Sequence, residues 1–121
     1  MFAGKKPVVV VGSINIDLVA NTEKIPVEGE TVLGKSFRIH LGGKGANQAV
    51  AVARLGYPVC MVGRLGDDSF GAQLKAHLES AGVDVAGVAI SSGTSGVAMI
   101  VVAEKGENSI VITPGANALL T

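Results

Sequence analysis

The sequence predicts an α/β fold in which a core sheet with flanking helices carries a second, small β-sheet. Three observations favour this fold class: a β-branched run near the N-terminus, two helical patterns that alternate with strands, and a C-terminal third that shows strand patterns alone. The chain has 121 residues, of which 48% are hydrophobic, and this is enough for one domain with a buried core.

The first third of the chain predicts three strands. Residues 7–12, PVVVVG, form the short valine run that is typical of a fully buried strand in a parallel sheet. Residues 14–21, INIDLVAN, alternate, so that apolar and most polar side chains take opposite faces of a second strand. Residues 25–31 predict a loop, and residues 31–41 predict a third strand, interrupted at Gly34.

Two helices follow, separated by a strand. Downstream of the glycine-rich stretch 40–50, small apolar residues recur at helical spacing. Residues 57–66 predict another buried strand, and residues 67–82 predict a helix that Asp68 or Ser69 can cap at its N-terminus. The inner face of that helix would carry Phe70, Leu74, Leu78 and Ala81.

The remaining residues predict strands. Residues 85–90 form one, and residues 96–103 and 108–113 form a hairpin around the turn at 104–107. The chain stops at Thr121, an N-cap residue type with no helix after it, so we expect either a truncated domain or a second half that is supplied otherwise.

Composition excludes several classes of partner and compartment. Ten Lys and Arg residues balance ten Asp and Glu residues, so we expect no nucleic acid and no membrane surface as a partner. The longest apolar runs, such as VAMIVVA at 97–103, are much shorter than a membrane span, and the N-terminus shows no secretory signal. The single cysteine, Cys60, is expected to be a buried inert thiol, and we expect a cytoplasmic protein.

The two histidines do not indicate a metal site. His40 and His77 lie far apart, and no Cys, His or carboxylate stands at ligand spacing from either of them. We therefore expect no metal to be bound by this chain.

The glycine-rich stretch HLGGKGANQAV, residues 40–50, lies where a strand turns into a helix. It is not a Walker loop, because Lys44 is followed by Gly45 and not by a hydroxyl residue. A dinucleotide fingerprint is also excluded, because only one glycine follows the first strand. Backbone N–H groups at a helix start, together with Asn47, predict a site for a ligand with hydroxyls or a partial negative charge. The alternative is a tight turn that needs glycines for steric reasons alone.

A second polar feature precedes it in the stretch GSINID. Asn15 and Asp17 stand two residues apart, so on a strand their side chains point to the same face. An amide beside a carboxylate can bind adjacent hydroxyls, because the two groups offer different donors and acceptors. The pair therefore predicts a polyol site, against the alternative of a solvated strand face.

Taken together, GSINID, GGKGANQAVAVARLG, GRLGDDSFG and GENSIVITPGANA resemble the ribokinase family of phosphofructokinase-B type carbohydrate kinases, in the family's order and spacing, over residues 7–120. The resemblance implies half of a ribokinase-like core sheet with flanking helices plus a small β-sheet lid. Within an N-terminal ribokinase-like region 1–121, the core would comprise residues 7–13 and 42–90, and the lid strands residues 14–41 and 96–113.

The resemblance also implies a substrate site for D-ribose or a similar sugar. Asn15 and Asp17 would hold sugar hydroxyls, Gly43, Lys44 and Asn47 would close around the ribose, and the lid would line the other side. The full set that it implies is Asn15, Ile16, Asp17, Gly43, Lys44, Gly45, Ala46, Asn47, Ala98, Ile100 and Ile112.

The activity implied is transfer of the ATP γ-phosphoryl group to the 5-hydroxyl of D-ribose. The resemblance implies MgATP and K⁺ for a complete enzyme, but in this family their sites and the catalytic aspartate lie beyond residue 121. We therefore expect no catalytic residue in this chain, no cofactor bound by it alone, and no activity of it alone. Asp67 and Asp68 are expected to cap a helix and not to replace the catalytic aspartate.

Three functions remain open at this point. One is the sugar-binding part of a ribokinase, the second is a related sugar or nucleoside kinase, and the third is a truncated, non-catalytic module that self-associates. In each case we expect a homo-oligomer, formed through the lid strands or through exposed sheet edges.

Overall fold

The computed structural model describes residues 4–121; residues 1–3 of the predicted region 1–121 lie outside the described part. Its first sheet, the core sheet, has the strand order β1 (Val8–Val11), β4 (Val59–Gly66), β5 (Asp84–Ser91), and every pairing in it is parallel. The predicted α/β class is therefore confirmed.

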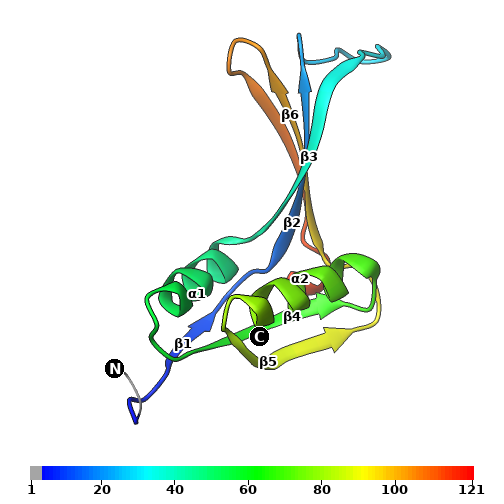
Figure 1. Cartoon of the computed structure of the whole chain (residues 1–121). Helices are drawn as coiled ribbons and strands as arrows, with labels where there is room; N and C mark the ends of the chain where they lie inside the picture. The colour runs from blue at the N-terminus through cyan, green and yellow to red at the C-terminus, as the bar shows by residue number, and fades with distance from the viewer. Residues whose placement is uncertain (1–3) are drawn as a thin grey trace.

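Two helices cover one face of the core sheet, as Figure 1 shows: α1 (Lys44–Arg54) and α2 (Ser69–Ser80). Each helix ends just before a glycine with positive φ, Gly56 at 82° and Gly82 at 94°. Glycine adopts this conformation at little cost, which explains why both helices end there. No helix of the described residues is long and apolar enough to cross a membrane.

The second sheet, the lid sheet, rises away from the core as a long twisted ribbon (Figure 1). Its strand order is β3 (Gly34–Gly42), β2 (Asn15–Thr22), β6 (Gly96–Ala103), β7 (Asn108–Thr113). The β2–β3 and β6–β7 pairs are antiparallel, whereas β2 and β6 run parallel. The predicted hairpin of β6 and β7 is thus present.

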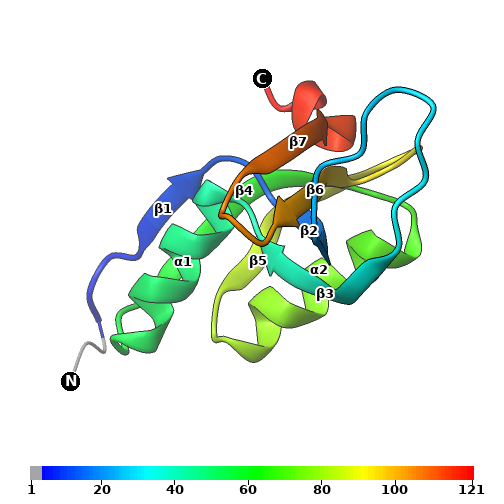
Figure 2. The ribbon, with the colours of Figure 1, turned by 90° about the horizontal axis from the view of Figure 1, so that it is seen from above.

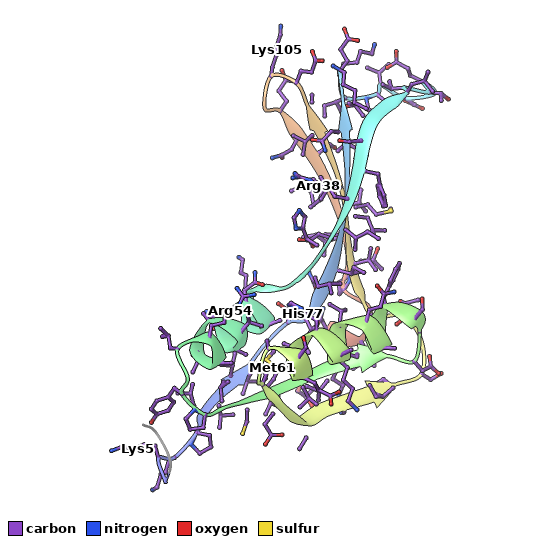
Figure 3. The ribbon with its side chains drawn as sticks, viewed as in Figure 1. Lys5, Arg38, Arg54, Met61, His77 and Lys105 are labelled. Carbon is purple, nitrogen blue, oxygen red and sulfur yellow. The ribbon has the colours of Figure 1, made fainter. Side chains whose placement is uncertain are left out.

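The apolar core lies between the helices and the sheet below them. Leu74 and Leu78 of α2 meet Met61 and Leu65 of β4, and all four side chains are fully buried. Figure 3 shows Met61 beneath the helices. The predicted inner stripe of the second helix is confirmed by Leu74 and Leu78, with Phe70 and Ala81 partly buried beside them.

Strand β1 is not fully buried, contrary to the prediction for residues 7–12. Val10 is buried under the helices, but Val9 and Val11 are 57% and 65% exposed. Successive side chains of a strand point to opposite faces, and α1 and α2 cover only one of them. A run of valines predicts a strand, but it does not indicate whether one or both faces of that strand are covered.

The predicted third strand is present, but it starts later than residue 31 and is not interrupted at Gly34. Strand β3 begins at Gly34, and residues 31–33 belong to the preceding loop. The reason lies in the pairing with β2, where the register shifts between Asn21 and Thr22, so that Thr22 faces Gly34. The glycine therefore marks the start of the strand.

The two faces of the lid sheet differ in what they contact. One face, here the inner face, carries Asp17, which pairs in register with Ala98, which in turn pairs with Ile112. The opposite, outer face is apolar and exposed along much of its length. Its large side chains are Phe37, Ile39, Met99 and Val111, exposed by 62%, 48%, 52% and 57%.

Candidate functional site

A cavity of about 500 Å³ lies where the lid sheet meets the core. It is bordered by the start of β2, the glycine loop before α1, the inner face of β6 and β7, and the segment after β7. Figure 2 shows these elements of the ribbon from above. Its lining residues are Ser13, Asn15, Asp17, Gly43, Lys44, Asn47, Ala98, Ile100, Ile110, Ile112, Pro114 and Asn117.

The polar side of the cavity begins with β2. Asn15 and Asp17 both line it, as the two-residue spacing predicts for side chains on the same face of a strand. Both are only half-buried, so their polar groups remain accessible from the cavity. An amide and an acidic side chain here offer both hydrogen-bond donors and acceptors to a ligand.

The glycine loop is held tightly against the chain segment that precedes β2. Gly43 has φ of 98°, and a Cβ there would lie 2.6 Å from the Ser13 carbonyl oxygen. A Cβ on Gly45 would lie 2.9 Å from backbone atoms of Gly12. The Ala46 N–H donates to the Ser13 carbonyl at 3.0 Å, so the loop and the strand entry form one unit.

Lys44 and Asn47 extend from the first turn of α1 into the cavity. Both residues are exposed, and the N-cap residue Gly43 provides no side-chain cap. The first N–H groups of a helix carry partial positive charge and seek acceptors. The N–H groups of Ala46 and Asn47 already donate to Ser13 and Gly43, so the donors on this side of the cavity are chiefly the Lys44 ammonium and the Asn47 amide.

The inner face of the lid sheet is apolar next to Asp17, which pairs with Ala98, which in turn pairs with Ile112. Ala98 and Ile100 of β6 and Ile110 and Ile112 of β7 present aliphatic side chains to the cavity. Polar groups on β2 and at the start of α1, together with an aliphatic surface on β6 and β7, suit a small ligand that has both hydroxyls and C–H groups.

Three residues that the resemblance implied do not line the cavity. Ile16 is fully buried in the core, because alternation sends it to the face opposite Asn15 and Asp17. Ala46 is also buried in the core, and Gly45 packs against Gly12. These three residues pack behind the cavity lining and support its backbone.

Four lining residues were not predicted: Ser13, Ile110, Pro114 and Asn117. Ile110 could have been found, because it lies two residues before Ile112 and therefore on the same strand face. Asn117 belongs to a short 3₁₀ helix, Gly115–Leu119, and contacts Ile14, 103 residues away. No local sequence pattern predicts such a contact.

The two aspartates 67 and 68 hold the loop between β5 and β6. Asp68 caps α2 by accepting from the Gly71 N–H at 2.9 Å, which confirms the predicted cap. It also accepts from the backbone N–H and the hydroxyl of Ser95, at 2.9 and 2.7 Å. Burial opposes ionisation, but the bonds from Ser95 and Gly71 outweigh it and hold the pKa of Asp68 below its ordinary value. The expectation that Asp67 also caps this helix is wrong, because its Oδ1 accepts from the Gly93 N–H at 2.9 Å instead.

Cys60 differs from the expected buried thiol. It is only half-buried and donates to Asp84 Oδ2 at 3.6 Å. Partial removal from water, and then the negative charge of Asp84, raise the pKa of the Cys60 thiol. A raised pKa disfavours the thiolate, which is the reactive form.

Among residues 4–121, no three His, Cys, Asp or Glu side chains gather in a way that could hold a metal ion. His40 lies on β3 of the lid, and His77 lies on α2 near the core, as Figure 3 shows for His77.

Comparison with known proteins places this geometry in a family. Residues 5–121 match the pfkB family carbohydrate kinases. The chain is 50% identical over 113 residues to the ribokinase of Bacillus subtilis, covering 93% of this chain and 38% of that protein. It is 44% identical over 115 residues to the deoxyribokinase of Salmonella typhimurium, covering 94% of this chain and 38% of that protein.

A solved structure shares the fold as well. The structure of Arabidopsis thaliana ribokinase complexed with ribose and ATP superposes with a TM-score of 0.85 at 42% identity, covering 92% of this chain and 36% of that one. The chain thus spans 36–38% of the length of these relatives. The family match covers nearly all of the sequence, including the motifs GSINID and GGKGANQA, whose residues line the cavity. The chain therefore belongs to the pfkB family of carbohydrate kinases.

Proposed function

We propose that this chain supplies the sugar-binding part of a ribokinase, which transfers the γ-phosphoryl group of ATP to the 5-hydroxyl of D-ribose. The observation that carries the proposal is the cavity that brings the polar side chains of Asn15, Asp17, Lys44 and Asn47 together with an aliphatic surface on β6 and β7. Its volume of about 500 Å³ lies in the range of small-molecule sites.

In this proposal each polar group has a binding role. Asp17 accepts hydrogen bonds from sugar hydroxyls, and Asn15 contributes its amide beside it. Lys44 and Asn47 donate from the first turn of α1. Ile100 and Ile112 pack against the C–H groups of the sugar, and this contact orients the ring.

Phosphoryl transfer in the proposal depends on groups outside this chain. The cavity offers one carboxylate, Asp17, and no described cluster of three His, Cys, Asp or Glu side chains could hold a metal. This donor set does not fit a Mg²⁺ or K⁺ site, so we assign MgATP and K⁺ to a complete enzyme and derive no step from them. The chain by itself is expected to form no ribose 5-phosphate from ribose and MgATP above a blank without protein, and product above that blank would contradict this.

The choice of sugar has one specific rival. The Salmonella typhimurium relative, 44% identical, is a deoxyribokinase, so 2-deoxy-D-ribose is the second candidate ligand. Calorimetric titration of the chain with each sugar separates the two. Tighter binding of the deoxy sugar would replace ribose as the proposed substrate.

The Asp17 carboxylate provides the sharpest test of the site. Its removal in Asp17→Ala costs a charge-assisted hydrogen bond, roughly 1.5–3 kcal/mol, so ribose affinity should fall more than about tenfold. Asn21→Ala, on the same face of β2 but outside the cavity lining, is the matched control and should keep its affinity. Equal affinity of both variants would mean that Asp17 is a solvated strand residue.

We further propose a homo-oligomer, formed through the apolar outer face of the lid sheet or through the exposed edge at β1, in the cytoplasm. Phe37, Ile39 and Met99 on the outer face are about half exposed or more, and such patches favour association. Sedimentation at micromolar concentration tests it. A stable species with the mass of one 12.2 kDa chain would contradict it.

A further inference from the structure

Asn117, in the 3₁₀ helix after β7, contacts the polar side of the cavity through three hydrogen bonds. Its Oδ1 accepts from the Ile14 N–H at 3.0 Å. Its Nδ2 donates to the Ile14 carbonyl at 3.1 Å and to Asn15 Oδ1 at 2.7 Å.

The backbone of Ile14 determines which way the Asn117 amide points. A backbone N–H can only donate and a carbonyl can only accept, so the oxygen of Asn117 must face the N–H and its nitrogen the carbonyl. In the opposite orientation, Asn117 Nδ2 would face the Ile14 N–H, donor against donor, and Asn117 Oδ1 would face the Ile14 carbonyl, acceptor against acceptor. Because Ile14 is fully buried, its backbone has little water with which to replace these bonds.

The orientation of the Asn117 amide also determines the orientation of the Asn15 amide. The second hydrogen of Asn117 Nδ2 needs an acceptor, and the only atom of the Asn15 amide that accepts is Oδ1. The oxygen of Asn15 is thereby engaged, and its Nδ2 group is left to face the cavity that Asn15 lines.

We propose that Asn117 is a positioning residue that fixes the Asn15 amide so that its two N–H donors face the cavity beside the acceptor carboxylate of Asp17. This inference rests on the proposed sugar site. It specifies that site further: of two neighbouring hydroxyls, the one at Asn15 must accept a hydrogen bond and the one at Asp17 must donate one. The ligand class is a polyol in which one hydroxyl accepts from the Asn15 amide and a neighbouring hydroxyl donates to Asp17.

Two other features hold Asn117 in this place. The Ala116 N–H donates to the Thr94 carbonyl at 2.9 Å and attaches the 3₁₀ helix to the loop before β6. At Gly96, a Cβ would overlap Asn117 Nδ2 and lie 2.6 Å from Asn15 Oδ1. A glycine at position 96 therefore leaves the space that the Asn15–Asn117 contact occupies.

The orientation can be measured without any sugar, by hydrogen exchange of the side-chain amides in the ¹⁵N-labelled chain. Both Asn117 amide hydrogens are donated within the protein, so they should exchange more slowly than those of Asn15, by about tenfold for one net hydrogen bond. In Asn117→Asp the nitrogen is replaced by an oxygen that can only accept. Asn15 should then turn to donate to it, and its hydrogens should become the protected ones.

The consequence for binding is tested with Asn15→Asp. The new carboxylate still accepts from Asn117 Nδ2, so the fold keeps that bond, but the donors toward the cavity are lost. D-ribose affinity measured by calorimetry should fall about tenfold or more. Asn108→Asp, an exposed position on β7 outside the cavity lining, introduces the same charge and should leave affinity unchanged.

The two measurements separate this inference from the proposed function. Faster exchange of Asn117 than of Asn15 in the unmodified chain would overturn the inference, and that measurement requires no variant to fold. Full ribose affinity in Asn15→Asp would also overturn it, since an oxygen would then serve in place of the donors. If the unmodified chain binds neither ribose nor deoxyribose, the proposed sugar site fails, while the exchange rates still decide whether Asn117 positions Asn15.

Discussion

The core sheet and the lid sheet use methionine in opposite ways. Met61 of β4 is fully buried beneath α1 and α2, whereas Met99 of β6 is 52% exposed on the outer face of the lid sheet. The core sheet has helices on one face, whereas the outer face of the lid sheet packs against the core only at its base, through residues such as Ile16 and Leu18, and extends beyond α1 and α2 (Figure 1). The lid is therefore built from strand pairing and from its junction with the core, and its apolar side chains are left available for other contacts.

The largest effect is expected from truncating the buried methionine. Met61→Ala should lower the free energy of unfolding by about 2–5 kcal/mol, because it leaves a cavity in a packed core. Met99→Ala, the matched lid variant, should cost less than about 1 kcal/mol, because half of its side chain is already in contact with water. Denaturant unfolding of both variants measures the difference. Equal losses would show that an outer partner already covers the lid face.

The junction between the sheets gives the next largest effect. Alanine normally stabilises a helix relative to glycine, but Gly45→Ala should destabilise this protein by about 1–3 kcal/mol. The reason is the 2.9 Å approach of the new Cβ to the backbone of Gly12. Gly34→Ala is the control, since its Cβ would lie at an ordinary 3.4 Å from the Asn21 carbonyl oxygen. Thermal unfolding distinguishes the two, and a stabilised Gly45→Ala variant would mean that the loop is not packed as described.

A smaller, pH-dependent effect is expected at Asp68, which connects α2 with the loop leading to the lid. Asp68→Ala should cost about 1–2 kcal/mol at neutral pH. Because the pKa of Asp68 is lowered by folding, its stabilisation is complete above the ordinary value of 3.8 and is lost as the pH falls through the lower folded-state pKa. The stability difference between the unmodified chain and the variant should therefore shrink in acid. A difference that stays constant from pH 7 to pH 2 would exclude the ionised carboxylate as its source.

Much of the fold follows from local pattern. Alternation in residues 14–21, the glycine at each helix end and the Asp68 cap depend on neighbours within a few residues, so the sequence contains the information for them. The placement of Asn15 and Asp17 on one cavity face follows from the same alternation. The rule also excludes Ile16 from the cavity, although family resemblance alone includes it.

The parts that could not be predicted depend on distant segments. Whether Val9 and Val11 are covered is decided by which face α1 and α2 pack on, and the start of β3 at Gly34 is decided by a register shift in the pairing with β2. Asn117 reaches Ile14 across 103 residues. In each case the residue that determines the structure is distant in sequence, so a local sequence pattern cannot predict its effect.

The contact between Ile14 and Asn117 has a consequence for the order in which the chain acquires structure. The first strand of the lid is made early during synthesis, but the side chain that orients its Asn15 amide is the fifth residue from the end of this chain. Closing a loop of about 100 residues has an entropic cost that must be met before the contact stabilises anything. We therefore expect the helix-covered core to form first and the Asn15 amide to become oriented only when Asn117 reaches Ile14 and Asn15.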